Sequence, residues 1–445
     1  MNQIKQALKA ILRYIDSIFA RIGSAVVKMI RDSSRTPRPA NQTQRLYIDA
    51  TYIYSTNINT GIQRVVRNII KHMEAHTHKR GIEFITAALV NGAFVKIEQE
   101  ELKTFQDQSN IASILQRVKR KIKLYGASFF KGEILYEDDI LLMLDSSWHL
   151  HVWPSVDYAK QRGAKIIGVT YDLIPITHPQ FCDDVMEHYF TEWYRQSMRY
   201  FDGYIAISQT VMQSLIDYFD RQNAVMQCYT FASFTLGADI DTDPTDTETA
   251  RESLITLYQN RPSIYLTVST IEPRKNHRFV YETFKKLWNN NFDTTWVIVG
   301  RSGWKTEALQ QEMREDKAFQ DKLWIFNDLS DAELHYCYQH SKALLFPSVI
   351  EGFGLPIIES LKNGLPVLAS DIPIHREVGD EMISYFDLSQ PDSLLSLIEN
   401  IETGSAVLKQ IDKESVTIAS WDESADELLE KTIAIANYAK QKGNI

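Results

Sequence analysis

The sequence predicts an α/β protein built from two doubly wound domains, each with a mostly parallel sheet. Short β-rich runs alternate with helical patterns along most of the chain, which is typical of parallel sheets covered by helices. The alternation is interrupted once, by residues 238–260, which open with an acidic, turn-rich run, and then it restarts. The length of 445 residues also exceeds that of one domain, for which about 100 to 200 residues is usual.

The chain before the interruption predicts an N-terminal domain over residues 45–240. Its runs of aliphatic and aromatic residues are short and bounded by polar turns, as expected for buried strands. The predicted strands cover residues 46–52, 84–89, 140–144, 165–170 and 203–207. Apolar residues at three- and four-residue steps predict helices at residues 62–76, 154–162 and 185–200.

The chain after the interruption predicts a second domain over residues 241–420 with the same alternation. The predicted strands cover residues 263–269, 295–299, 323–326, 343–347 and 366–369. The predicted helices cover residues 277–289, 331–340 and 356–363. In such folds ligands bind beyond the carboxyl ends of the strands, so we expect a ligand in a cleft that the two domains share.

Residues 1–44 differ from the rest of the chain in charge. Residues 1–45 hold nine Lys or Arg against two acidic residues, a balance of +7, which leaves 39 basic and 55 acidic residues, or −16, for the remainder. From Ile4 to Ile30 apolar residues recur at helical spacing with basic residues between them, which predicts a basic amphipathic helix and then a linker. Such a helix binds an anionic membrane surface, here through residues 1–31. Packing on the protein's own surface or on a second subunit is the alternative.

Composition excludes a disordered chain and an integral membrane protein. Hydrophobic residues make up 44% and charged residues 24%, and no stretch approaches the roughly 20 apolar residues of a spanning helix. The three cysteines are too scattered for a disulfide framework, which indicates a reducing compartment. Charges interrupt every apolar run near the start, unlike a secretory signal. We therefore expect a cytoplasmic protein, peripheral on the inner face of the plasma membrane.

Residues 346–380 form the most informative stretch, FPSVIEGFGLPIIESLKNGLPVLASDIPIHREVGD. A predicted strand leads to Glu351, a Gly-Phe-Gly turn follows at 352–354, and Pro356 stands where a helix can start. Glu359 lies near the beginning of that helix. The turn glycines let backbone amides approach a ligand, and the helix N-terminus adds partial positive charge suited to phosphate.

Two carboxylates bracket this predicted anion site. Because carboxylates repel phosphate, we expect them to accept hydrogen bonds from hydroxyl groups, of a sugar on one side and of a ribose on the other. A glutamate near a helix start can instead serve the helix dipole or a capping box, and this alternative stays open for Glu359.

This stretch resembles the signature of retaining nucleotide-sugar glycosyltransferases with the GT-B fold, specifically glycosyltransferase family 4 (glycosyl transferases group 1), which carries two glutamates separated by seven residues. The resemblance covers about residues 46–435 and extends to bacterial polysaccharide mannosyltransferases. It implies two Rossmann-like domains facing a central cleft, with a final helix over residues 421–445 that crosses back onto the first domain. It also implies that Glu351 contacts donor-sugar hydroxyls and that Glu359 holds the ribose. The donor diphosphate would bind the turn formed by Gly352, Phe353, Gly354 and Leu355.

Basic residues in both domains fit the same resemblance. Arg274 and Lys275 follow the first strand of the second domain, where they resemble the family's diphosphate clamp, which stabilises the leaving group without a metal. In isolation such a pair at a strand end is usually only solvated. In the first domain, the run TGIQRVVRNIIKHM places Gly61 in a turn and Arg64 one helical step further, like the family's glycine loop facing the donor phosphates.

Three residues of the first domain are expected on the acceptor side. Tyr171 and Asp172 follow a predicted strand, which presents them to the cleft. Many relatives have histidine before this aspartate, so the sugar contact of that histidine does not carry over to Tyr171. Asp172 is expected among the catalytic residues, where it orients the acceptor or stiffens the loop; capping of a turn is the alternative. Ser208 matches a family serine that caps a helix near the acceptor, and capping alone explains it equally well.

Two further clusters have open interpretations. The run QRVKRKIK at residues 116–123 is basic and could meet anionic lipid or a lipid-linked acceptor, or it is a solvated helix face. Trp148, His149, His151 and Trp153 lie close together, but no carboxylate stands at ligand spacing, so we expect no metal site.

The resemblance therefore implies a metal-independent retaining hexosyltransferase. A nucleotide-diphospho-sugar would be its substrate, with no cofactor, and a glycan or lipid-linked hydroxyl would be the acceptor in lipopolysaccharide or capsule synthesis; no nucleic acid is expected as a partner. The alternatives are a catalytically idle scaffold of a polysaccharide-assembly complex, and a sugar-nucleotide epimerase or phosphorylase on the same fold. The intact set Glu351, Glu359, Arg274 and Lys275 argues against the scaffold, and nothing marks a lysine for pyridoxal phosphate.

Overall fold

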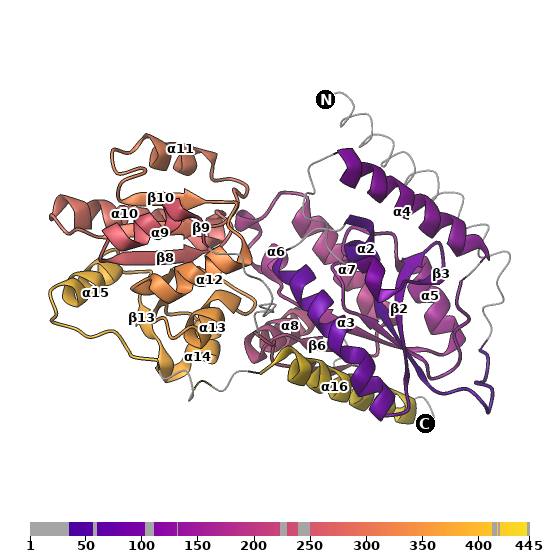
Figure 1. Ribbon diagram of the computed structural model, residues 1–445. Coiled ribbons are helices and arrows are strands. Elements are labelled where there is room, and N and C mark those ends of the chain that lie inside the picture. Colours follow the sequence, from indigo (N-terminus) through magenta and orange to yellow (C-terminus); the bar gives the residue numbers. More distant parts are fainter. Residues whose placement is uncertain are drawn as a thin grey trace. The chain divides into compact units, whose positions relative to one another are not determined.

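A computed structural model divides the chain into two compact units (Figure 1). The first unit comprises Met1–Leu173, His188–Gly237 and Ala419–Ile445, and the second comprises Ile174–Glu187 and Ala238–Ile418. The structure describes residues 35–56, 60–102, 111–130, 132–222, 229–238, 250–411, 416 and 419–442. The helix predicted within residues 1–31 lies outside the described residues.

The first unit is built on a seven-stranded sheet with the order β3-β2-β1-β4-β5-β6-β7. Its neighbouring strands are parallel except for the antiparallel pair β2 and β3. The strands are β1 Arg45–Asp49, β2 Glu83–Val90, β3 Ala93–Lys96, β4 Ile140–Met143, β5 Lys165–Thr170, β6 Gly203–Ala206 and β7 Thr230–Ser233. The helices include α2 Thr51–Thr56, α3 Gly61–Lys79, α4 Ile111–Phe130, α5 Trp153–Arg162, α7 Met186–Tyr200, α8 Gln209–Arg221 and α16 Trp421–Lys442. All residues of β1 and β4 are buried, as expected where helices cover both faces of a parallel sheet.

Helix α16 closes the first unit by packing along α3 (Figure 1). Trp421, at the start of α16, is 1% exposed. A Cβ atom on Gly237 would lie 2.5 Å from the backbone nitrogen of Trp421, so this close approach requires glycine. His76 of α3 lies 2.9 Å from carboxylate oxygens of both Asp422 and Asp426, which joins the two helices at their surface.

The second unit is built on a six-stranded, fully parallel sheet with the order β10-β9-β8-β11-β12-β13. The strands are β8 Ile264–Val268, β9 Thr295–Val299, β10 Leu323–Phe326, β11 Ala343–Phe346, β12 Val367–Ser370 and β13 Ser384–Phe386. The helices are α6 Ile174–Thr177, α9 Glu252–Asn260, α10 His277–Asn289, α11 Glu307–Glu315, α12 Asp331–His340, α13 Leu355–Lys362, α14 Pro373–Gly379 and α15 Ser393–Glu402. Side chains alternate between two apolar cores, one holding Tyr265 and Trp296 and the other holding Leu266 and Val297.

In each sheet, successive strands are added first on one side of the initial strand and then on its other side. In the first unit this topological switch lies between β1 and β4, and in the second it lies between β8 and β11. Loops that leave the carboxyl ends of these two strands turn to opposite sides, which opens a crevice where ligands of doubly wound folds bind.

The predicted fold class of two doubly wound α/β domains is confirmed, and several elements agree to the residue. These are β5, β9, β10, α10 and α12. The strand predicted at 46–52 is wrong at its end, because it stops at Asp49, whose carboxylate accepts a hydrogen bond from the Thr51 amide at 2.9 Å and starts α2. The short edge strands β3, β7 and β13 were not predicted.

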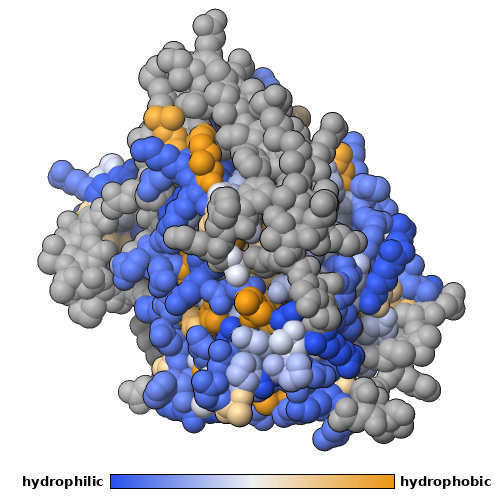
Figure 2. Space-filling model, turned by 90° about the vertical axis from the view of Figure 1, so that its right-hand side faces the viewer, coloured by the Kyte–Doolittle hydropathy of each residue, from blue (hydrophilic) through white to orange (hydrophobic). Residues whose placement is uncertain are grey.

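The described helices contain no segment both long and apolar enough to cross a membrane. One face of the molecule is shown in Figure 2, where hydrophilic side chains predominate and apolar side chains form only separate patches. On α4, which carries the basic run 116–123, Leu115 is 44% exposed and Ile122 is 55% exposed.

Candidate functional site

The turn between β11 and α13 is shaped by one glycine. Gly354 has φ +102° and stands at the N-terminus of α13, a backbone conformation that favours glycine strongly. Pro356 follows in the first helical turn, where its fixed φ suits a helix and its missing N–H costs nothing. The first amides of an α-helix have no partner within the helix, so the start of α13 offers hydrogen-bond donors to an anion.

Three of the predicted residues meet at the switch of the second sheet. Arg274 Nη1 lies 2.6 Å from Glu351 Oε2, and Lys275 Nζ is hydrogen-bonded to Glu351 Oε1. Arg274 Nη2 also lies 2.7 Å from an oxygen of Glu272, and the Val349 amide donates to the Arg274 carbonyl at 2.8 Å. The loops after β8 and β11 are therefore joined by side chains and backbone together. We call Glu272, Arg274, Lys275 and Glu351 the ion cluster.

The ion cluster is largely withdrawn from water. The side chain of Glu351 is 7% exposed, that of Lys275 is 12% exposed and that of Arg274 is 21% exposed. Lys275 Nζ also lies 5.2 Å from the centre of the Phe346 ring, within the range of a cation–π contact. Buried charges are stable only when they are paired, and here two carboxylates face two cations.

Electrostatics keeps Glu351 ionised at neutral pH. Burial alone would raise the pKa of Glu351, but the positive charges of Arg274 and Lys275 outweigh it and lower the pKa to about 2. Burial lowers the pKa of Lys275, and the neighbouring Arg274 adds to this effect. Burial raises the pKa of Glu272 against the influence of the two cations. Glu351 is therefore a carboxylate at neutral pH, bonded to both basic side chains beside the start of α13.

Glu359 lies on α13, eight residues after Glu351 of the ion cluster. It is 4% exposed, and Tyr338 of α12 donates a hydrogen bond to its Oε2 at 2.8 Å. Tyr338 was missed by sequence reasoning, because it precedes the motif and reads as an ordinary core aromatic. Its bond orients the carboxylate of Glu359 within the second unit.

His375 is a second residue that sequence reasoning missed. It is fully buried, its ring lies 5.1 Å from that of Phe346, and its Nδ1 lies 2.9 Å from the Ser370 carbonyl. Burial lowers its pKa to about 4, so the imidazole is neutral at neutral pH. His375 lies five residues after the end of β12, within the motif stretch 346–380. This position after a strand is the sequence feature from which its place near the site could have been predicted.

In the first unit, the predicted phosphate-facing residues begin α3. Gly61 is exposed and is the first residue of the helix, and Arg64 lies one turn further. A Cβ atom on Gly61 would meet nothing within 4 Å, so packing does not explain this glycine. The first amides of α3 are again available to an anion.

The structure corrects one acceptor-side expectation. Tyr171 is not presented to a ligand, because it is 4% exposed and its hydroxyl donates to the Leu144 carbonyl at 2.7 Å. Its neighbour Asp172 is half-buried at the carboxyl end of β5. Ser208 is buried and caps α8 by accepting a hydrogen bond from the Val211 amide at 3.1 Å.

Trp148 and His149 of the aromatic cluster pack against other aromatic rings. Trp148 lies 4.3 Å from the Phe190 ring, and His149 lies 4.9 Å from the Tyr52 ring. Across the described part of the chain, no group of three or more His, Cys, Asp or Glu is arranged to hold a metal ion.

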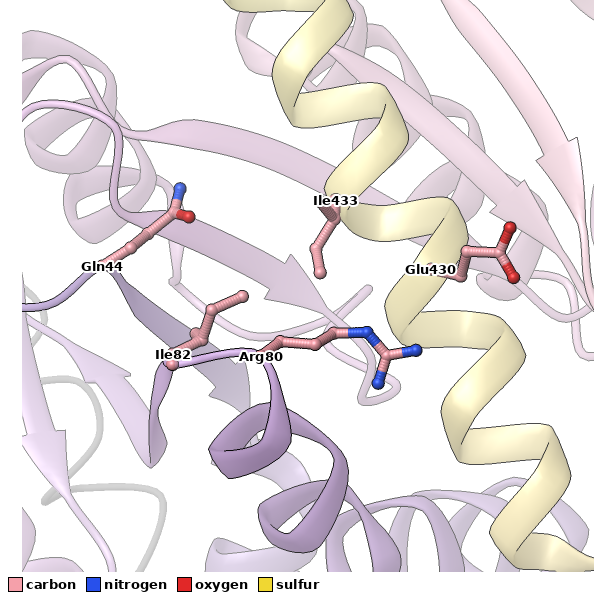
Figure 3. A pocket seen from close by; sticks show the side chains of 6 residues that line it. Gln44, Arg80, Ile82, Glu430 and Ile433 are labelled. Atoms are coloured by element: carbon pink, nitrogen blue, oxygen red, sulfur yellow. The ribbon is translucent and has the colours of Figure 1, made fainter.

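A cavity of about 350 Å³ lies at the other end of the first sheet (Figure 3). Gln44 and Ile82 line it from the amino ends of β1 and β2, Arg80 lines it from the end of α3, and Glu430 and Ile433 line it from α16. It is therefore remote from the carboxyl ends of the strands, where the candidate residues of this unit lie.

The fold and the site define an α/β protein of two doubly wound units, with two basic residues and two carboxylates near the start of α13. In comparisons with known proteins, its similarities lie among glycosyltransferases. Residues 251–415 match the family described as Glycosyl transferases group 1. The Anabaena protein HepE, whose crystal structure holds UDP and glucose, has a TM-score of 0.52 at 12% identity and covers 91% of this chain and 100% of its own.

Several sequence relatives are named as bacterial mannosyltransferases. The serotype-specific mannosyltransferase WbdA of Escherichia coli is 27% identical over 413 residues, which cover 90% of this chain and 48% of WbdA. The O-antigen chain mannosyltransferase RfbU of Salmonella typhimurium is 32% identical over 145 residues, which cover 32% of this chain and 40% of RfbU. The chain thus spans about half the length of the WbdA relatives that it matches.

The ion cluster predicts a large stability effect. Glu351→Ala leaves Lys275 buried without its carboxylate partner, so the free energy of unfolding should fall by about 3 to 5 kcal/mol. Urea denaturation followed by tryptophan fluorescence measures it. Asp371→Ala is the control, because its ion pair with Arg376 lies on the surface and should contribute nothing measurable. Equal losses in the two variants would show that Glu351 is not a required counter-ion.

Proposed function

We propose that this protein is a retaining glycosyltransferase that moves a mannose-like hexose from a nucleotide-diphospho-sugar to a hydroxyl of a glycan or lipid-linked acceptor in cell-surface polysaccharide synthesis. The observation that carries the proposal is the ion cluster, which places two basic side chains beside the N-terminus of α13 at one switch point. The similarity to WbdA and RfbU supports a mannosyl donor and an O-antigen-type product.

The donor diphosphate is the group that this arrangement fits best. Arg274 supplies a planar fork for phosphate oxygens and Lys275 a compact charge, while the turn from Gly352 to Leu355 supplies amides. In the free protein both cations are bonded to Glu351. Arrival of a diphosphate lets the cations share their bonds with phosphate oxygens, while the carboxylate accepts bonds from sugar hydroxyls.

The reaction breaks the bond between the sugar C1 and the phosphate oxygen and forms a bond from C1 to the acceptor oxygen on the same face. The hydroxyl proton passes to the departing phosphate, so no side chain needs to act as a covalent nucleophile. Arg274 and Lys275 stabilise the negative charge that develops on the leaving nucleoside diphosphate. These fixed charges take the part that a metal ion plays in other phosphate sites, and no cofactor enters the reaction.

The remaining residues receive their roles within the same proposal. Gly61 and Arg64 face the donor phosphates, and Glu359 holds the ribose with Tyr338 fixing its carboxylate. Asp172 orients the acceptor, and Ser208 supports that side by capping α8.

A direct experiment tests the activity. The protein is incubated with GDP-mannose, UDP-glucose and related donors without acceptor, and release of nucleoside diphosphate is measured. Slow hydrolysis of one donor supports a transferase, and thermal shifts against the same panel identify the base. A folded protein that neither binds nor hydrolyses any nucleotide-sugar would be an idle scaffold.

The cations predict a metal-free reaction. Arg274→Ala or Lys275→Ala should lower turnover by about 10² to 10³, the loss found when a positioned transition-state donor is removed. Arg278→Ala is the control, since this arginine of α10 forms an exposed ion pair with Glu312 of α11. EDTA should leave wild-type turnover intact. A strict requirement for Mg²⁺ or Mn²⁺ would contradict the charge clamp.

The two glutamates predict different kinetic effects. Glu351 acts as the sugar parts from its phosphate, so Glu351→Ala should lower kcat by orders of magnitude. Glu359 makes contacts that change little during transfer, so Glu359→Ala should raise donor KM by about 10- to 150-fold, the equivalent of one charge-assisted hydrogen bond. Steady-state kinetics on variants with native circular dichroism decides this. The same modest KM effect in both variants would remove Glu351 from the catalytic step.

Residues 1–31 are proposed to bind an anionic membrane. Their deletion should release the protein from vesicles that contain phosphatidylglycerol while turnover of a soluble acceptor analogue stays nearly unchanged. Vesicle flotation and kinetics measure the two effects. Unaltered flotation would move the membrane contact to the basic face of α4 at residues 116–123, and loss of folded protein would make the segment structural.

A further inference from the structure

Two buried carboxylates occupy the switch point of the first sheet. Asp49 ends β1 and Asp145 follows β4, and they are 0% and 4% exposed. These are the strand positions that, in the second sheet, precede Arg274 with Lys275 and Glu351. Neither aspartate has a role in the proposed reaction so far, and buried acids outside an ion pair require a physical reason.

Both carboxylate oxygens of Asp145 accept hydrogen bonds from backbone amides. Its Oδ2 accepts the Ile53 amide of α2 at 2.7 Å, and its Oδ1 accepts the Ser146 amide at 2.7 Å. The Ser146 hydroxyl in turn accepts a hydrogen bond from Gln63 Nε2 at 2.8 Å. Gln63 lies in the first turn of α3, two residues after Gly61. Asp145 is therefore connected to that turn through the hydrogen bonds of Ser146.

Asp49 differs in having one unused oxygen. Its Oδ1 accepts hydrogen bonds from the amide and the hydroxyl of Thr51, and the Thr51 hydroxyl accepts from the Leu89 amide at 2.9 Å. Its Oδ2 is buried and makes no hydrogen bond of normal geometry within the described chain, although the nearby Ser147 side chain lowers the pKa of this carboxyl group to some extent. A proton on this oxygen would remove the cost of a second buried negative charge.

The electrostatics of the pair agree with one retained proton. Burial, and then the charge of Asp145, raises the pKa of Asp49 from an ordinary 3.8 to about 7. Burial raises that of Asp145 to about 6, against the effect of its amide donors. Two interacting carboxylates release their protons in two steps that belong to the pair.

The groups facing the pair do not titrate in the same range. Burial raises the pKa of Tyr52 on α2 and of Tyr171 after β5, so both stay neutral. Arg67 of α3 acts on Asp145 as a cation throughout. Burial lowers the pKa of His149, which contacts the Tyr52 ring, below its ordinary 6.5. Among the groups that face the pair, the two carboxylates are therefore the ones that change charge between pH 6 and 8.

We propose that Asp49 and Asp145 share one proton, with Asp49 protonated and Asp145 charged, and that this pair positions the first turn of α3, residues 60–64, for the donor phosphates. The proposal rests on the proposed function for its last step. Loss of the shared proton places two negative charges in one buried site, which weakens the hold on α2 and on Gln63. Both aspartates are positioning residues, because they contact the protein's own amides and no substrate.

Hydrogen exchange tests the shared proton without any donor. In the wild type, the protection of amides 51–56 and 61–67, corrected for intrinsic exchange, should fall about 10-fold between pH 6 and pH 8.5, the equivalent of one pKa unit. Asp49→Asn mimics the protonated acid and should remove this pH dependence. Asp145→Asn loses charge-assisted bonds and should lower protection about 10- to 100-fold at pH 6 already. Equal effects of the two variants, or protection in the wild type that is constant with pH, would overturn the proposal.

Stability provides the second readout, with its sign fixed by the raised pKa. The folded chain keeps a proton that the unfolded chain releases, so this contribution to stability is complete below about pH 4 and is lost as the pH rises through about 7. Melting temperatures of Asp49→Asn should lack this decline. Asp139→Asn is the matched control, a buried aspartate at the amino end of the same sheet paired with Arg45 at 2.7 Å. It should lower the melting temperature but leave the protection of amides 51–56 and 61–67 unchanged.

Kinetics tests the link to the donor. Gln63→Ala cuts the bond to Ser146 and leaves both carboxylates in place, so donor KM should rise severalfold while the melting profile keeps its pH dependence. Wild-type KM should rise between pH 6 and pH 8.5, and Asp49→Asn should remove the rise. If the exchange results hold but KM of every variant is constant, the pair does not position a donor site. If no nucleotide-sugar is turned over at all, the proposed function fails while the exchange results still decide the shared proton.

Discussion

The need to pair buried charge organises the second unit. Glu351 is almost fully buried and ionised, so it is stable only while Arg274 and Lys275 remain beside it. These residues lie more than 70 positions apart in sequence and meet because β8 and β11 are neighbours in the sheet. The ion cluster therefore forms only in the correctly ordered sheet, and it fixes the turn that begins α13. Stability and the geometry of the anion site depend on the same bonds.

Both units concentrate their unusual electrostatics at one topological position. The switch between β1 and β4 holds two acids, and the switch between β8 and β11 holds two acids with two cations. Loops leave such a point to opposite sides, so backbone polar groups there lack neighbours in the sheet and must be satisfied by side chains. Asp145 satisfies amides of α2 and of its own loop, and Glu351 satisfies the two cations. One rule of sheet topology thus explains where the chemistry of both units lies.

Sequence patterns predicted what depends on local physics. Strands β5 and β9 were found to the residue because they are continuous apolar runs bounded by polar residues. The glutamate motif was readable because its members lie within one turn and helix. The pairing of Asp49 with Asp145 was not, because 96 positions separate them and an aspartate after a strand reads as a turn residue. The expectation for Tyr171 was wrong for a related reason. A side chain at a strand end can face the surface or turn back toward a neighbouring strand, and the hydroxyl of Tyr171 donates a hydrogen bond to the Leu144 carbonyl.

Within the proposed function, the ion cluster also accounts for a preference for a nucleotide-sugar over a simple anion. Two cations facing the start of a helix would attract any phosphate, but bonds to Glu351 and Glu272 balance their charge in the free protein. A simple anion must then compete with two carboxylates and gains little. A nucleotide-sugar gains more, because its hydroxyl groups can bond to the same carboxylate whose cations its phosphates engage. Selectivity for a phosphate that carries a sugar therefore follows from placing the acid between the bases, and it depends on both charges of the pair being present.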